Sequence, residues 1–151
     1  MSNPEDPRVP LNSIVLGYGP MLPLIAAGIG AWLLPLAWAA LATRLAIIWG
    51  ALILAFIAGV RRGFGFGDPR ASTTVEIATM MVYFILAGLA LVVPTASMAL
   101  PLLMIGFALV ALLDRRAALT GNAPAHFARL RVPQMLLGIL GLAFIWARLP
   151  F

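Results

Sequence analysis

Glu76 is the one acidic residue inside a long apolar stretch of this sequence, "TVEIATMMVYFILAGLALVV". An ionisable group is expensive to bury in a membrane, so such a residue is a candidate polar site. Thr73 stands three residues earlier and completes the Thr-x-x-Glu pattern of a helix capping box. Glu76 also lies close enough along the chain to pair with Arg61 or Arg62. Two interpretations stay open: a structural helix terminus, or a site for a proton or a partner.

Arg61 and Arg62 end an apolar run and precede three glycines that alternate with phenylalanine. The spacing Gly63-x-Gly65-x-Gly67 resembles a phosphate-binding loop, but such loops follow a strand and open a helix. Here the glycines follow a predicted transmembrane helix, so they indicate a turn at the membrane surface. We predict that a set of arginines contacts lipid headgroups or a partner protein: Arg61, Arg62, Arg115, Arg116, Arg129 and Arg131.

His126 is the only histidine, and the chain has no cysteine. The chain therefore offers few of the residues that histidine-ligated haem, a multi-histidine metal site or a Ser-His-Asp triad would require. We expect no catalytic residue, no cofactor and no metal site. The net charge of +5 comes from ten arginines, but no soluble element gathers them on one face, so we expect no nucleic-acid binding.

The composition indicates an integral membrane protein. Hydrophobic residues make up 63% of the chain and charged residues 10%, and the mean hydropathy is +1.05. A soluble domain is nearer half apolar and a quarter charged. This sequence has too few charges to cover a surface that faces water.

Five stretches are long and apolar enough to cross roughly 30 Å of hydrocarbon. We predict an all-α bundle of five transmembrane helices, with spans at about 14–34, 39–60, 74–93, 95–113 and 132–149. Residues 1–13 form a polar N-terminal tail, and residues 14–151 form one transmembrane domain. Pro20 and Pro23 predict a kink in the first span.

Arginine is distributed unevenly between the two predicted sides of the membrane. The tail and the second and fourth connections carry eight arginines, and the other side carries Arg44 and Arg148. Positive residues favour the cytoplasmic side. We therefore expect a multi-pass protein of the bacterial inner membrane, with a cytoplasmic N-terminus and a periplasmic C-terminus.

Small residues recur every four positions in the second span, at Ala51, Ala55, Gly59 and Gly63. This spacing forms a flat ridge that lets another helix approach closely. We predict that the ridge packs against a helix of this chain or of a partner.

The stretch "WGALILAFIAGVRRGFGF" resembles the signature of DUF3429, a family of small membrane proteins of unknown function that includes the transmembrane protein 69 group. The matching residues are Trp49, Gly50, Ala51, Phe56, Gly59, Val60, Arg61 and Gly63. "LGYGPMLPLI" and "HFARLRVPQMLLGILGL" are similar to the family's first and last spans. Ala58 and Arg62 depart from the pattern, which has glycine and tryptophan there. The resemblance implies the five spans but no reaction.

We expect a non-catalytic accessory or assembly subunit of a larger inner-membrane complex, such as a respiratory or photosynthetic one. Its expected partners are membrane lipids and other integral membrane subunits. The alternative is a small oligomeric transporter or channel that uses Glu76. An enzyme acting on lipid or quinone is a third reading. It would have to draw its polar groups from Arg61, Arg62, Glu76, Asp114, Arg115 and Arg116.

Overall fold

The computed structural model describes residues 11–63, 73–121, 123 and 126–149. The elements in chain order are α1 (Leu11–Tyr18), a 3-10 turn η1 (Gly19–Met21), α2 (Leu22–Leu33), α3 (Leu36–Gly63), α4 (Thr73–Val92), α5 (Ala96–Leu119) and α6 (Phe127–Arg148). All regular structure in these ranges is helical, as predicted. The N-terminal tail up to residue 10 and the glycine–phenylalanine run at 64–67 lie outside the described residues.

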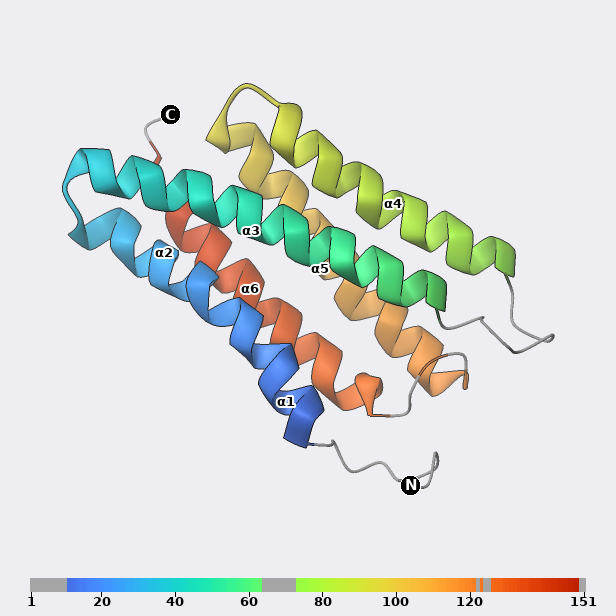
Figure 1. Ribbon diagram of the computed structural model, residues 1–151. Coiled ribbons are helices and arrows are strands. Elements are labelled where there is room, and N and C mark those ends of the chain that lie inside the picture. Colours follow the sequence, from blue (N-terminus) through green and yellow to red (C-terminus); the bar gives the residue numbers. More distant parts are fainter. Residues whose placement is uncertain (1–10, 64–72, 122, 124–125, 150–151) are drawn as a thin grey trace.

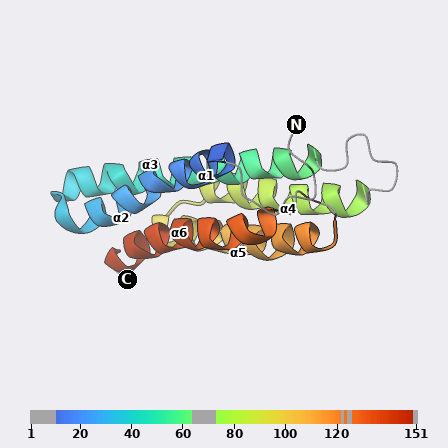
Figure 2. The same ribbon diagram turned by 90° about the horizontal axis from the view of Figure 1, so that it is seen from below.

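Within the described ranges, five helical segments are long and apolar enough to cross a membrane, with α1, η1 and α2 together forming the first. They lie side by side in one bundle (Figures 1 and 2). Helix α2 packs between α3 and α6, α4 packs between α3 and α5, and α5 packs along α6. Helices α3 and α5 also contact each other across the bundle.

The bundle has two unlike ends (Figure 1). At the turn end, short connections join α2 to α3 and α4 to α5, and α6 ends there. At the loop end, α1, α4 and α6 begin and α3 and α5 end. Proline explains one tight turn: Leu34 precedes Pro35 and is extended, with ψ 154°, because the residue before proline disfavours the helical region.

The predicted kink in the first span is confirmed as η1, which contains Pro20. A break in a transmembrane helix must have its free backbone groups satisfied by neighbours. Trp49 of α3 serves this role, since its indole N–H donates to the carbonyl of Pro20 at 2.8 Å.

Helices α2 and α6 approach each other through glycine. A Cβ atom added at Gly141 would lie 2.6 Å from the carbonyl oxygen of Leu24, and one at Gly28 would lie 2.8 Å from the carbonyl oxygen of Gly141. Backbone cannot move aside as a side chain can, so only glycine fits at this crossing.

The helices extend further than the predicted spans at the loop end. Helix α5 continues past residue 113 to Leu119, and α6 already begins at Phe127. Charged residues mark where the hydrocarbon ends, but Ala, Leu and Arg remain good helix formers beyond that level. Asp114 and Arg131, which the sequence placed in a connection, are therefore helical residues.

Candidate functional site

A buried carboxylate lies at the centre of the loop end. Asp114 of α5 is 0% exposed. Its Oδ2 atom lies 3.3 Å from Nε of Arg131, and its Oδ1 atom lies 3.9 Å from Nη1 of Arg61. The hydroxyl of Tyr83 donates to Oδ1 at 3.3 Å. One side chain thus contacts α3, α4 and α6, and we call Arg61, Tyr83, Asp114 and Arg131 the ionic cluster.

Helical periodicity explains why Asp114 faces inward. Leu103, Phe107 and Val110 are fully buried on α5, and Asp114 continues their spacing of four, three and four residues. Residues at this spacing share one helix face. The carboxylate of Asp114 therefore lies on the same face of α5 as these apolar core residues, at the end of their row nearest the loop end.

Arg61 and Arg131 are buried as well, at 5% and 7% exposure. The sequence pattern predicts headgroup or partner contact for both arginines, whereas the structure directs them into the bundle. Arg61 follows Leu54, Ile57 and Ala58 on the buried face of α3. A guanidinium pair around one carboxylate offsets part of the cost of burying charge in a low-dielectric interior.

Arg131 connects the cluster to the N-terminal helix. Its Nη1 atom donates to Oε1 of Gln134 at 3.2 Å, and its guanidinium carbon lies 4.2 Å from the centroid of the Phe127 ring. That ring meets His126 edge-on at 4.9 Å, and His126 hydrogen bonds with Ser13 of α1 at 3.3 Å. These contacts connect the ionic cluster with Ser13 of α1 through Phe127 and His126.

His126 lies just before α6, outside the membrane-spanning segments. Partial burial lowers its pKa below the ordinary value of 6.5, and the positive charge of Arg131 lowers it further. The imidazole is therefore neutral at pH 7, so its contact with Ser13 joins two neutral groups.

Glu76 lies in the first turn of α4 and is 4% exposed. It shares a face with Thr79 and Tyr83, which are also buried. Its Oε2 atom has no hydrogen-bond partner among the described residues. The structure thus adds burial to the sequence observation, and the capping and proton-site interpretations both stay predictions.

The other arginines of the predicted contact set lie nearer the surface. Arg62 is half-buried, and Arg115, Arg116 and Arg129 are exposed at the loop end. These positions suit the predicted contact with headgroups or a partner, which stays a prediction.

The predicted small-residue ridge on α3 divides into two parts. Ala51 is buried at 1% exposure and Ala55 is partly buried. Gly59 is exposed, and apart from the chain neighbours and the backbone of α3 itself, no atom of a described residue lies within 4 Å of a Cβ built at Gly59 or Gly63. The first part packs inside the chain, and the second leaves open space.

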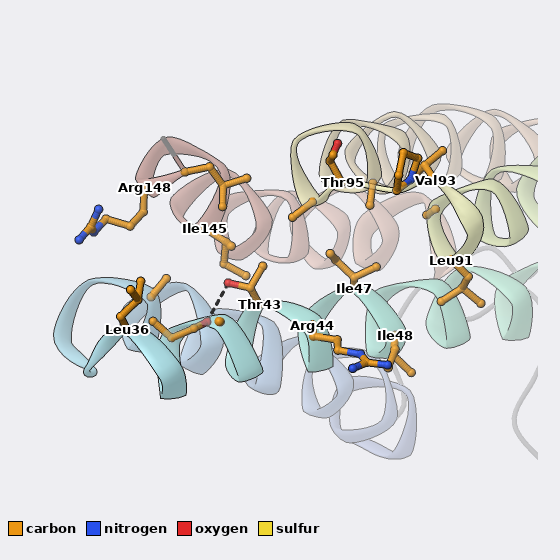
Figure 3. A pocket seen from close by; sticks show the side chains of 18 of the residues that line it. Leu36, Thr43, Arg44, Ile47, Ile48, Leu91, Val93, Thr95, Ile145 and Arg148 are labelled. Atoms are coloured by element: carbon orange, nitrogen blue, oxygen red, sulfur yellow. Dashed lines mark hydrogen bonds between the residues drawn. The ribbon is translucent and has the colours of Figure 1, made fainter. Parts of the chain in front are cut away.

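The turn end contains a cavity of about 820 Å³ between α3, α4, α5 and α6. Figure 3 shows its lining, which is largely aliphatic. The hydroxyl of Thr43 donates to the carbonyl of Ala39 at 2.9 Å, within its own helix.

Arg44 and Arg148 are exposed, and the guanidinium of Arg148 lies 5.8 Å from the centroid of the Trp32 ring. Charge at this end stays at the surface.

The sequence pattern does not single out Tyr83, Gln134 or the central role of Asp114. The available signal was spacing: Asp114 follows Val110 by four residues and Phe107 by seven, which is a core position of α5. The neighbouring Arg115 and Arg116 led to its assignment to a connection.

Comparisons with known proteins give a family and no activity. Searches among curated proteins and among solved structures found no significant match. The model of one family, described as a protein of unknown function (DUF3429), matches residues 9–147. This range includes the ionic cluster, and Arg61 belongs to the stretch that resembles the family signature. The chain is therefore a member of the DUF3429 family of multi-pass membrane proteins.

Proposed function

We propose that this protein is a non-catalytic accessory or assembly subunit of a larger complex in the bacterial inner membrane, with the loop end in the cytoplasm. The main observation in support of this proposal is the buried ionic cluster at the loop end. Arg61, Arg131 and Tyr83 each contact Asp114, so the four side chains join four helices. These groups fix the arrangement of the bundle.

A fixed bundle suits a protein that presents a surface to others. The outward side of α3 near the loop end carries Phe56, which is 73% exposed, and the open space around Gly59. Small residues allow a helix of another subunit to approach closely. The uneven distribution of arginine supports the cytoplasmic position of the loop end.

The test is extraction of the tagged protein from its native membrane in mild detergent, followed by native gel electrophoresis and mass spectrometry. We expect co-migration with one large complex at fixed stoichiometry. Gly59→Leu should release the protein from that complex, because the added side chain blocks the approach of a partner helix.

The matched control is Gly88→Leu, since Gly88 of α4 is also exposed with no described neighbour within 4 Å. This variant should stay in the complex. A wild-type band of about 16 kDa or a small homo-oligomer would contradict the proposal.

The second candidate function is a small oligomeric transporter or channel. It is favoured by Glu76, a buried carboxylate in a predicted span whose Oε2 lacks a hydrogen-bond partner among the described residues. Intramembrane carboxylates often serve proton or ion transfer. Proteoliposome flux that is lost in Glu76→Gln at unchanged protein abundance would support transport. Equal flux in both proteins would remove Glu76 from any transport role.

A further inference from the structure

A second cavity opens at the loop end between α1, η1, α3 and α6, with a volume of about 500 Å³. Its walls are mainly apolar, and Leu16, Met21 and Phe56 are among them. Two buried polar side chains, Arg131 and Gln134, also line it. We call this cavity the loop-end groove.

The groove runs along the outer side of α3. Trp49, Leu52 and Phe56 line it and are 41%, 55% and 73% exposed. The lining of α3 extends from Trp49 to Val60, a length of about 16 Å at 1.5 Å per residue. Because these residues lie on a face open to hydrocarbon, the groove offers a lateral path for an alkyl chain.

The polar wall of the groove contains N–H donors that the contacts described above do not use. The ion pair and the hydrogen bond of Arg131 with described residues use Nε and Nη1, so the guanidinium Nη2 is not used in these two contacts. Gln134 accepts the bond from Arg131 through Oε1, which leaves its amide N–H groups as donors. Guanidinium groups bind phosphate in preference to neutral acceptors.

The excess of positive charge at the loop end also favours an anionic ligand over a neutral one. Among the described residues of the loop end, six arginines stand against Glu76 and Asp114: Arg61, Arg62, Arg115, Arg116, Arg129 and Arg131. Within the ionic cluster itself, two guanidinium groups share one carboxylate. An anionic ligand would reduce this excess, whereas a neutral amphiphile would not.

We propose that the loop-end groove binds one acidic glycerophospholipid of the surrounding bilayer. Its phosphate contacts Arg131 and Gln134, and one acyl chain lies along α3 towards Trp49. Free phosphate would leave the apolar length of the groove unused. The proposal goes beyond an accessory role, because it concerns the isolated chain and needs no partner subunit.

The test is native mass spectrometry of the purified full-length protein in mild detergent, with phosphatidylglycerol or phosphatidylethanolamine of identical chains added. The wild type should retain one phosphatidylglycerol at least about tenfold better than phosphatidylethanolamine, a ratio that corresponds to ~1.4 kcal/mol. Gln134→Leu should reduce this preference while the contact of Asp114 with Arg131 remains.

A matched pair of substitutions separates the groove from the general surface. Leu52 lines the groove and Leu45 does not, yet both lie on α3 and are 55% exposed. Leu52→Trp should abolish retention by filling the groove, and Leu45→Trp should retain lipid as the wild type does. Equal retention in the two variants, equal binding of the two lipids, or binding of inorganic phosphate with the same affinity would each overturn the proposal.

Discussion

The two ends of the bundle handle charge in opposite ways. At the loop end, Arg61 and Arg131 are buried and both contact the buried Asp114. At the turn end, Arg44 and Arg148 are exposed. The same residue type therefore has two roles, and its position on the core or outer face of its helix decides which.

Connectivity offers a physical reason for the difference. At the turn end, short connections hold α2 beside α3 and α4 beside α5, so little further restraint is needed. At the loop end, longer connections leave the same helices less constrained, and closing longer loops costs more entropy. The ionic cluster supplies non-covalent restraint where the chain supplies less.

The largest effect is expected for Asp114→Asn. The substitution leaves two buried guanidinium groups without their carboxylate, and breaking a buried ion pair in this way costs about 3–5 kcal/mol. The free energy of unfolding, measured in mixed micelles with increasing dodecyl sulfate, should fall by that amount. Arg148→Gln at the turn end is the control and should change it by less than about 0.5 kcal/mol. Equal effects at the two ends would contradict the comparison.

The crossing of α2 and α6 is the next most sensitive place. Gly141→Leu would force backbone apart at Leu24, and overpacking of this kind costs about 1–3 kcal/mol. The same unfolding measurement should show this loss, whereas Gly59→Leu should be close to neutral because no side chain of the described residues lies within 4 Å of a Cβ built at Gly59. If both variants unfold like the wild type, α2 and α6 do not approach as closely as the structure shows.

Tyr83→Phe should have a moderate effect. It removes one hydroxyl that donates to Asp114 at 3.3 Å, and hydrogen bonds to charged groups contribute about 1.5–3 kcal/mol. Since this bond is long, we expect a loss near the lower limit. The loss should be smaller when Tyr83→Phe is combined with Asp114→Asn, because the acceptor then carries no charge and the hydroxyl can instead donate to the carbonyl oxygen of Leu109, 3.4 Å away. An undiminished loss in the double variant would show that the hydroxyl acts elsewhere.

The smallest effect concerns His126. Its pKa is lowered in the folded protein, so the unfolded state binds more protons as the pH falls through about 6.5. The free energy of unfolding should therefore decrease below pH 6.5 and become level once the folded form is also protonated. His126→Asn should flatten this part of the pH profile. A profile unchanged by the substitution would exclude His126 as its source.

The sequence predicts the membrane class and the five spans because hydrophobic length depends only on local composition. It also predicts the break at Pro20, a property of one residue. The ionic cluster is harder to predict from the sequence, because it joins side chains from four helices. Arg61 and Arg115 look alike as members of adjacent pairs at helix ends, and only the helical phase separates a buried arginine from an exposed one. The glycine contact of Gly28 with Gly141 depends likewise on which helices become neighbours.

The central claim is that charge pairing within the cluster stabilises the loop end, and a double-mutant cycle on Asp114 and Arg131 tests it most directly. Asp114→Asn, Arg131→Met and the double variant would be unfolded in the same mixed micelles. The account predicts a coupling free energy of at least about 2 kcal/mol, with the double variant more stable than the two separate losses imply. Additive losses, with a coupling near zero, would show that the two charges do not depend on each other and would contradict the account.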